Sequence, residues 1–288
     1  MIFETQKKAC DNSIGIAGCG NMGLPMLQTL LANNINAKGY DIRHQDNFLL
    51  VKDHFMESKR EFILDNQIIF SIVRDEEETL ELCEGKNGLF SLKEKKLVII
   101  CSTLSPRFIE SLKRKAPVNI ELIDAPMSGA SIAAKEARLT FMVGSTRKQF
   151  EYISPLLFIM GTNVFHLGEF GSGMAIKVLN NFVTASTVVS VRKVIYQARR
   201  MSIDVEKLLK TIDCSSGQNW FSTNRANIEW FEEVYEKDNT IGILDKDVRA
   251  YADAFENGSD DITGARDFCD AVLTGLNNLE NLKKNKLF

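Results

Sequence analysis

A glycine-rich turn between a strand and a helix is the feature that most restricts the fold of this chain. Residues 13–17 form a short apolar run typical of a β-strand, and residues 24–32 have the pattern of a helix. Residues 18–23 join them and read GCGNMG, which matches the G-x-G-x-x-G pattern of a dinucleotide-binding turn. The first glycine permits the turn, the second lets a pyrophosphate approach the backbone, and the third lets the helix pack close to the strand. We therefore expect a dinucleotide site, rather than a purely structural turn, held by Gly18, Gly20, Asn21, Met22 and Gly23.

An acidic residue follows the second predicted strand, which covers residues 36–40. Asp41 lies close to the roughly 20-residue spacing expected for the acid that binds the ribose. Its carboxylate would repel a 2′-phosphate and so favours NAD, whereas Arg43 nearby favours NADP. We expect NAD to be preferred over NADP. The alternative is that Asp41 is only a turn residue after a strand.

Further apolar runs alternate with helical stretches through the first half of the chain. This alternation predicts an α/β Rossmann fold with a doubly wound parallel sheet. Ligands of such sheets bind beyond the carboxyl ends of the strands, and the pairs Ser102-Thr103 and Ser128-Gly129 fall at such ends. The predicted strands are residues 67–73, 97–101, 120–123, 139–143 and 163–166.

The second half of the chain has no strand signals after Gly173. A long apolar helix continues to about Met201, and a helix apolar on more than one face is buried by its own domain or by a partner chain. We expect a dinucleotide-binding domain over residues 13–168 and an all-helical domain over residues 169–288 that is opened by this helix. The later predicted helices are residues 205–212, 220–235, 243–256 and 263–282.

The composition excludes several classes of partner and compartment. The 288 residues are 44% hydrophobic and 25% charged, and a net charge of −3 offers no general attraction for nucleic acid or an anionic membrane. Charged and amide side chains interrupt the apolar helix, which argues against a membrane span. The six cysteines form no C-x-x-C pair and the three histidines have no metal-ligand spacing, so we expect no metal and a reducing compartment. Residues 1–12 are short and polar, and we expect a loose extension on a cytoplasmic protein.

A lysine lies inside the long apolar helix. Residues 171–181 read GSGMAIKVLNN, and Lys177 and Asn181 are four residues apart, hence on one face of the helix. Most helical lysines extend the amine from a core helix to solvent, and taken alone this structural explanation is the more common one. The alternative is that Lys177 transfers a proton, and the other segments of the chain favour it.

Several segments together resemble one enzyme family. The sequence resembles the β-hydroxyacid dehydrogenases, the group of 3-hydroxyisobutyrate dehydrogenase, tartronate semialdehyde reductase and, more distantly, 6-phosphogluconate dehydrogenase. The matching segments, in chain order, are IGIAGCGNMGLPM at residues 14–26, Ser102-Thr103, DAPMSG at residues 124–129 with LTFMVG at residues 139–144, GSGMAIKVLNN at residues 171–181, and Lys246-Asp247.

The resemblance implies an NAD(P)-dependent interconversion of a small 3-hydroxy acid with its semialdehyde or keto acid. It also implies a Rossmann domain joined by a long helix to a helical domain, in a homodimer or homotetramer. Lys177 falls on the catalytic lysine of the family, and Asn181, Ser128 and Gly129 fall on positions that bind the small carboxylic acid substrate. The family uses positions beside the cofactor that correspond to Val73, Thr103 and Lys246.

The chemistry of the reaction agrees with a lysine at this place. Oxidation of an alcohol needs a base for the hydroxyl proton while hydride leaves for the nicotinamide. Burial and the positive nicotinamide disfavour a charged ammonium, which would allow Lys177 to act as this base. In the reverse direction the protonated amine would donate to a carbonyl oxygen. We expect Lys177 to lie in a cleft between the two domains.

Some residues depart from the family pattern. Ala130 stands where most relatives have the second glycine of Ser-Gly-Gly, Ile132 and Ala137 replace two further glycines, and Arg74 replaces a proline. These departures suggest an altered acid pocket and leave two alternatives open. One is an imine reductase of the same architecture, a group that generally lacks the lysine. The other is a non-catalytic dinucleotide-binding protein, which would need neither Lys177 nor Asn181.

Overall fold

The computed structural model describes residues 8–254 and 264–282, which fall into two compact units. Unit 1 is Met1–Lys177 and unit 2 is Val178–Phe288. The division lies inside helix α7 (Ser172–Arg200), whose first turns belong to unit 1 and whose remainder belongs to unit 2.

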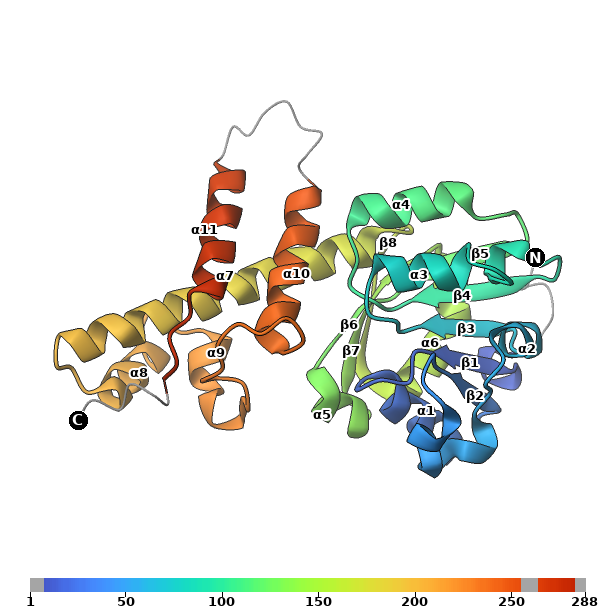
Figure 1. The fold of residues 1–288 in the computed structure, drawn as a ribbon, viewed down its shortest axis with the longest axis horizontal. Coiled ribbons are helices and arrows are strands. Elements are labelled where there is room, and N and C mark those ends of the chain that lie inside the picture. The colour runs from blue at the N-terminus through green and yellow to red at the C-terminus, as the bar shows by residue number, and fades with distance from the viewer. Residues whose placement is uncertain (1–7, 255–263, 283–288) are drawn as a thin grey trace. The chain divides into compact units, whose positions relative to one another are not determined.

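Unit 1 is built on a sheet that has eight strands in the described part of the chain. The strand order is β2-β1-β3-β4-β5-β7-β6, and β8 pairs with β7 outside this path (Figure 1). The strands are β1 (Ile14–Ala17), β2 (Ala37–Tyr40), β3 (Ile68–Ser71), β4 (Lys96–Ile100), β5 (Ile120–Asp124), β6 (Met127–Ser128), β7 (Leu139–Gly144) and β8 (Gly161–Gly168).

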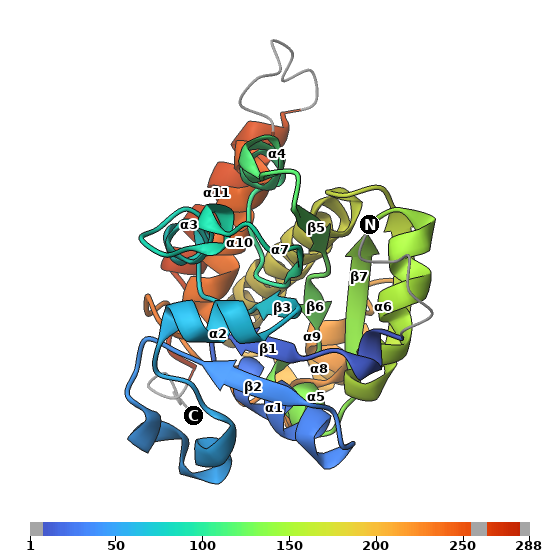
Figure 2. The same cartoon turned by 90° about the vertical axis from the view of Figure 1, so that its right-hand side faces the viewer.

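The first five strands of the sheet are parallel, and β1 lies between β2 and β3 (Figure 2). The chain therefore adds its second strand on one side of β1 and its third on the other, which creates the topological switch point where ligands of doubly wound sheets bind. The predicted α/β Rossmann fold is confirmed.

The parallel arrangement does not extend to every strand of the sheet. Strand β7 pairs antiparallel with both β5 and β6, and β8 runs parallel to β7. The cause is the short connection at residues 129–138, which holds only helix α5 (Ala130–Lys135). A parallel crossover needs about a dozen residues or more, so this connection lets the chain turn back at the carboxyl edge of the sheet instead.

Helices cover both faces of the sheet because alternate strand residues face opposite ways. Ile68 and Phe70 of β3 belong to one apolar core, whereas Ile69 belongs to the other. Helices α1 and α6 supply the first core and helices α2, α3 and α4 the second, on the opposite side of the sheet (Figure 1). Their bounds are α1 (Gly23–Ala32), α2 (Lys59–Asp65), α3 (Glu76–Cys83), α4 (Pro106–Lys115) and α6 (Arg147–Met160).

The residues before β1 also pack on unit 1. Residues 9–11 form a 3₁₀ turn, Ala9 is buried, and the side-chain amide of Asn12 donates a 2.8 Å hydrogen bond to the hydroxyl of Tyr152 on α6. The expected loose extension is therefore wrong for residues 8–12, and residues 1–7 lie outside the described residues. Other 3₁₀ segments are Gln45–His54, Leu89–Ser91 and Arg225–Asn227.

Unit 2 is helical throughout its described part. The part of α7 that belongs to it packs with the other helices around one apolar core, in which α10 and α11 lie side by side (Figure 1). These helices are α8 (Val205–Asp213), α9 (Trp220–Thr223), α10 (Thr240–Asp253) and α11 (Ala265–Asn277). The last two predicted helices extended into residues 255–263, which lie outside the described residues, and α11 ends before the predicted residue 282.

The helix predicted over residues 220–235 is wrong beyond α9. The side-chain amide of Asn224 donates to the carbonyl of Trp220, and the Arg225 guanidinium donates to the carboxylate of Asp213 at 2.6 Å. Such side-chain bonds to local backbone and to a neighbouring helix compete with helical hydrogen bonds and end the helix.

By length and composition alone, α7 passes a test for a membrane-crossing helix, the one helix to do so within residues 8–254 and 264–282. A core helix of a soluble protein passes the same test. Val188, Val191 and Ile195 of α7 are buried in the core of unit 2, which accounts for this apolar composition.

Candidate functional site

The three glycines of the turn after β1 have different steric surroundings. A Cβ on Gly18, whose φ is +92°, would lie 2.5 Å from the carbonyl oxygen of Ile72, and a Cβ on Gly23 would lie 1.9 Å from that of Gly18. The fold itself therefore requires these two glycines. A Cβ on Gly20 would meet no atom of the described residues within 4 Å. The space over Gly20 is thus left open, as a bound pyrophosphate requires.

The N-terminus of α1 follows this open space. Its N-cap is Met22, which makes no side-chain capping hydrogen bond, and the N–H of Leu24 donates to the carbonyl of Gly20 at 3.1 Å. Gly20 and Asn21 are exposed and Met22 is half-buried. The dipole of the helix favours a phosphate at this N-terminus. The residues predicted to bind the dinucleotide therefore fit that group.

Asp41 and Arg43 form a pair against the glycine turn. The Asp41 carboxylate accepts a 2.8 Å hydrogen bond from the backbone N–H of Cys19 and bonds of 2.9 and 3.0 Å from the Arg43 guanidinium. Arg43 also donates to the carbonyl of Cys19 at 3.1 Å. Burial alone would raise the pKa of Asp41, but the hydrogen bonds and charge of Arg43 and the Cys19 N–H outweigh it and lower that pKa. Asp41 is therefore a carboxylate, and it lies beside the turn as predicted.

Val73 and the Ser102-Thr103 pair follow β3 and β4, the next strands beyond β1 in the sheet. The Ser102 hydroxyl donates a 2.6 Å hydrogen bond to the carbonyl of Val73. The chain at Ile72 and Val73 is also the segment that a Cβ on Gly18 would meet. The structure thus brings Gly18, Val73 and Thr103 to the carboxyl edge of three neighbouring strands at the switch point.

The Ser128-Gly129 pair begins the turn into α5. Ser128 pairs with Thr140 of β7, and Gly129 has a φ of +132°. Ala130 and Ala137 have φ values of +55° and +53°, in the left-handed region that favours glycine. Family members usually have glycine at these two positions, and this chain keeps the backbone conformation that favours glycine although alanine stands there. Ile132 is exposed on α5.

Lys177 lies in the second turn of α7 and is buried, with 7% of its surface exposed. The helix begins at a buried carboxylate that the sequence analysis did not place in the site. Asp124, the last residue of β5, accepts hydrogen bonds of 2.6 Å from the backbone N–H groups of both Gly171 and Met174. Burial raises the pKa of Asp124 to about 6, although the backbone N–H groups around it act in the opposite direction. The DAPMSG segment, which begins with Asp124, could have indicated this residue from the sequence.

In unit 2, Asn181 and Lys246 both contact Asp247, a second residue that was not predicted to belong to the site. The side-chain amide of Asn181 donates a 2.5 Å hydrogen bond to the carboxylate of Asp247, and both residues are buried. The Lys246 amine lies 3.7 Å from the other oxygen of the same carboxylate. Asp247 therefore links Asn181, predicted to bind substrate, with Lys246, predicted to lie beside the cofactor. The Lys246-Asp247 pair in the sequence could have indicated Asp247.

Two family models cover most of the chain. The model of the NAD binding domain of 6-phosphogluconate dehydrogenase matches residues 13–168, and that of the NAD-binding domain of NADP-dependent 3-hydroxyisobutyrate dehydrogenase matches residues 171–260.

Two individual relatives with similar sequences are dehydrogenases by name. The mitochondrial 3-hydroxyisobutyrate dehydrogenase of Bos taurus is 30% identical over 234 residues, which cover 76% of this chain and 66% of that protein. The 2-(hydroxymethyl)glutarate dehydrogenase of Eubacterium barkeri is 28% identical over 211 residues, covering 72% of this chain and 70% of that protein. The match to the bovine protein thus spans slightly less than two thirds of its length.

A solved structure shares the fold. The 3-hydroxyisobutyrate dehydrogenase of Mycobacterium tuberculosis, determined with L-serine, has a TM-score of 0.77 at 21% identity, with 94% of this chain and 95% of that chain covered. The first family model alone accounts for more than half of the residues. The predicted resemblance is therefore confirmed, and this chain belongs to the β-hydroxyacid dehydrogenase family within the 6-phosphogluconate dehydrogenase superfamily.

Proposed function

We propose that this protein is an NAD(P)-dependent oxidoreductase that interconverts a small 3-hydroxy acid with its semialdehyde or keto acid. The observation that carries the proposal is the burial of Lys177 on a helix whose first turn is fixed to the dinucleotide-binding sheet by Asp124. Lysine side chains are seldom buried in proteins, so a buried lysine at this position indicates a specific role. The names of the relatives support the same class of reaction.

Each group of residues has a part in the proposed reaction. A nicotinamide dinucleotide, when bound, would supply the hydride acceptor and donor of the reaction. The open face of Gly20 and the N-terminus of α1 would hold its pyrophosphate, and Asp41 would meet its ribose. Lys177 takes the hydroxyl proton during oxidation and returns it to the carbonyl oxygen during reduction.

The substrate of the proposed reaction is a short carboxylic acid. Ser128 and Gly129 supply a hydroxyl and a backbone N–H for its carboxylate, and Asn181 supplies an amide. The relative from Mycobacterium tuberculosis was determined with L-serine, itself a short 3-hydroxy acid, which supports this class.

A spectrophotometric screen tests the proposal. Purified protein is mixed with a set of short 3-hydroxy acids and NAD or NADP, and with the matching semialdehydes and NADH or NADPH, while the absorbance of the reduced nicotinamide is followed. We expect turnover with at least one 3-hydroxy acid. Cyclic imines with NADPH serve as the comparison, and turnover of imines alone would replace the proposal with an imine reductase.

We further propose that NAD is preferred over NADP, because the Asp41 carboxylate lies beside the glycine turn, where the ribose of a dinucleotide is expected. Asp41→Asn keeps an acceptor for the Cys19 N–H but removes the charge that repels a 2′-phosphate, and it releases Arg43 to bind that phosphate. We expect the ratio of kcat/KM for NAD to that for NADP to fall by about 10–100-fold, since one charged contact contributes about 1–3 kcal/mol. Steady-state kinetics with each cofactor measure this ratio.

Arg43→Gln is the matched control for the cofactor prediction. It keeps Asp41 and removes the cation, so the ratio is expected to stay the same or to rise. A ratio that is unchanged in Asp41→Asn would show that Asp41 does not select the cofactor.

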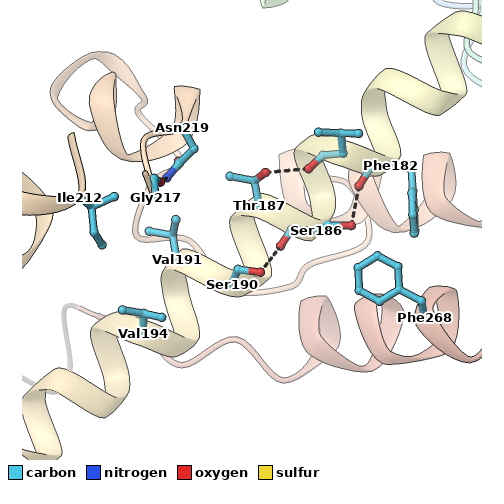
Figure 3. Close-up of a pocket in the computed structure, with 11 residues that line it drawn as sticks. Phe182, Ser186, Thr187, Ser190, Val191, Val194, Ile212, Gly217, Asn219 and Phe268 are labelled. Atoms are coloured by element: carbon cyan, nitrogen blue, oxygen red, sulfur yellow. Dashed lines mark hydrogen bonds between the residues drawn. The ribbon is translucent and has the colours of Figure 1, made fainter. Parts of the chain in front are cut away.

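We also propose that the protein is a homo-oligomer, in which a second copy covers an apolar groove on unit 2. The groove has a volume of about 440 Å³, and its lining within the described residues contains no charged side chain. Figure 3 shows that the hydroxyls of Ser186, Thr187 and Ser190 turn back to carbonyls of the preceding turn of α7, so their hydrogen-bonding capacity is used within the helix. Val183 and Phe268 on its rim are more than half exposed. An uncharged surface of this kind suits a symmetric contact with itself.

Val183→Asp tests the oligomer. Val183 is 65% exposed, so aspartate fits the isolated chain but places a charge in the proposed contact. We expect the wild-type protein to have at least twice the mass of one chain by light scattering coupled to size-exclusion chromatography, and the variant to shift toward the monomer. Val118→Asp changes a fully exposed valine of unit 1 and should leave the mass unchanged. A monomeric wild-type protein would exclude the oligomer.

A further inference from the structure

One carboxylate at the carboxyl edge of the sheet holds the start of the helix that carries Lys177. We propose that Asp124 is a positioning residue for Lys177, fixing the first turn of α7 so that the amine is delivered to one place. This inference rests on the proposed function of Lys177. Asp124 itself transfers no proton in the proposed reaction.

The beginning of α7 depends on this distant side chain. The carbonyl of Gly171 accepts a 2.9 Å hydrogen bond from the N–H of Ala175, so Gly171 is the N-cap of the helix. Glycine has no side chain with which to cap the first N–H groups, which Ser, Thr, Asp or Asn usually satisfy. The two oxygens of Asp124 take this part instead, one accepting from Gly171 and the other from Met174, each at 2.6 Å. The helix is therefore capped from strand β5.

Two glycines make the space that this contact needs. A Cβ on Gly144 of β7 would lie 2.2 Å from one oxygen of Asp124. A Cβ on Gly173 would lie 2.9 Å from the other oxygen and 2.1 Å from the carbonyl of Met142. The three segments DAPMSG, LTFMVG and GSGMAIKVLNN, which are far apart in the sequence, thus meet at one carboxylate.

The surroundings of the carboxylate leave it little freedom. Asp124 is fully buried, and its strand pairs with β4 on one side and with β7 on the other. Met174 is fully buried in the adjoining apolar core, where its sulfur accepts from the N–H of Leu104 at 3.3 Å. A negative charge at the N-terminus of a helix is also favoured by the helix dipole. The first turn of α7 is therefore attached to the rigid centre of unit 1.

The attachment lies close in sequence to both proposed chemical groups. Lys177 follows Met174 by three residues, within one helical turn, and Ser128 follows Asp124 by four residues. The same carboxylate therefore couples the position of the amine to the segment that meets the acid substrate. Loss of this contact would leave Lys177 present but displaced, and a displacement of about 1 Å from the productive geometry lowers turnover by about 100-fold.

Asp124→Asn tests the inference, because the amide has the shape of the carboxylate but only one acceptor atom, so one of the two N–H groups would face an NH₂ donor. We expect kcat to fall by about 10–100-fold. The dissociation constant for NAD is expected to stay within about twofold, because the glycine turn is untouched. Glu121→Gln, which neutralises a carboxylate on the same strand, is the matched control and should keep the wild-type kcat. A wild-type kcat in Asp124→Asn would overturn the inference.

A double-mutant cycle separates positioning from general destabilisation. If Asp124 acts through Lys177, then adding Asp124→Asn to Lys177→Ala lowers kcat no further. Multiplied losses in the double variant would overturn the inference. Full turnover in Lys177→Ala would instead overturn the proposed function, so the two failures are distinguishable.

Amide hydrogen exchange on the wild-type protein supplies a test that needs no variant. The amides of Gly171 and Met174 are expected to exchange as slowly as those of the central strands, because both are bound to a buried carboxylate. If Asp124→Asn does not fold, this measurement decides the question. Exchange of both amides at the rate of surface amides would overturn the inference.

Discussion

Lys177→Ala is expected to fold, to bind NAD with wild-type affinity and to lose about 10²–10⁴-fold in kcat. A general acid or base contributes about this factor, and alanine removes the amine while keeping a good helix former in the interior of α7. Steady-state rates on the best substrate of the screen give kcat, calorimetric titration gives the NAD dissociation constant, and circular dichroism reports the helix content. All three measurements are needed to assign the loss to the chemical step.

A second lysine of the same helix provides the control for this experiment. Lys193 is exposed on α7, so Lys193→Ala removes a positive charge from the same element without touching the proposed site. We expect its kcat to equal that of the wild-type protein. If Lys177→Ala retained near-normal turnover, Lys177 would not be the acid or base, whereas the dinucleotide fold would be unaffected.

Gly20→Ala is expected to keep the stability of the protein and to weaken dinucleotide binding by about 10–100-fold. A Cβ at this position meets no atom of the described residues within 4 Å, so the free protein accommodates it. The same methyl group occupies the space through which the pyrophosphate approaches the backbone, and an overpacked contact costs about 1–3 kcal/mol. Calorimetric titration with NAD and thermal unfolding of the free protein measure the two quantities.

Gly23→Ala is expected to lower the stability of the free protein, in contrast to Gly20→Ala. Its Cβ would lie 1.9 Å from the carbonyl oxygen of Gly18, so the turn itself has to move and the melting temperature falls. Equal loss of stability in the Gly20 and Gly23 variants would mean that both glycines serve only the fold. Unchanged NAD affinity in Gly20→Ala would show that the pyrophosphate does not bind over this turn.

Much of the fold was predictable because the signals are local. The glycine turn lies between a strand and a helix within about twenty residues, and the spacing of its three glycines is recognisable in that context alone. Two details of the fold were not predicted, the direction of one strand and the end of one helix. Strand β7 is antiparallel because its connection is short, and α9 ends early because Asp213 of another helix binds Arg225.

The candidate site was predictable to a similar extent. Lys177 and Asn181 were recognisable from their spacing on one helix and from the family resemblance. Asp124 was not, because its contacts join residues 47 and 50 positions apart, which no periodicity can indicate. Asp247 was missed for the same reason, since it meets Asn181 across 66 positions. The roles assigned to these side chains stay predictions until the variants are measured.

The alanine at position 130 has a consequence for the proposed acid-binding segment. Its backbone already adopts a left-handed conformation that glycine enters freely, so Ala130→Gly removes one methyl group without changing the path of the chain. The backbone conformation and the methyl group can therefore change independently. If this segment binds the acid as proposed, one substitution can alter the range of acids accepted while the loop keeps its conformation.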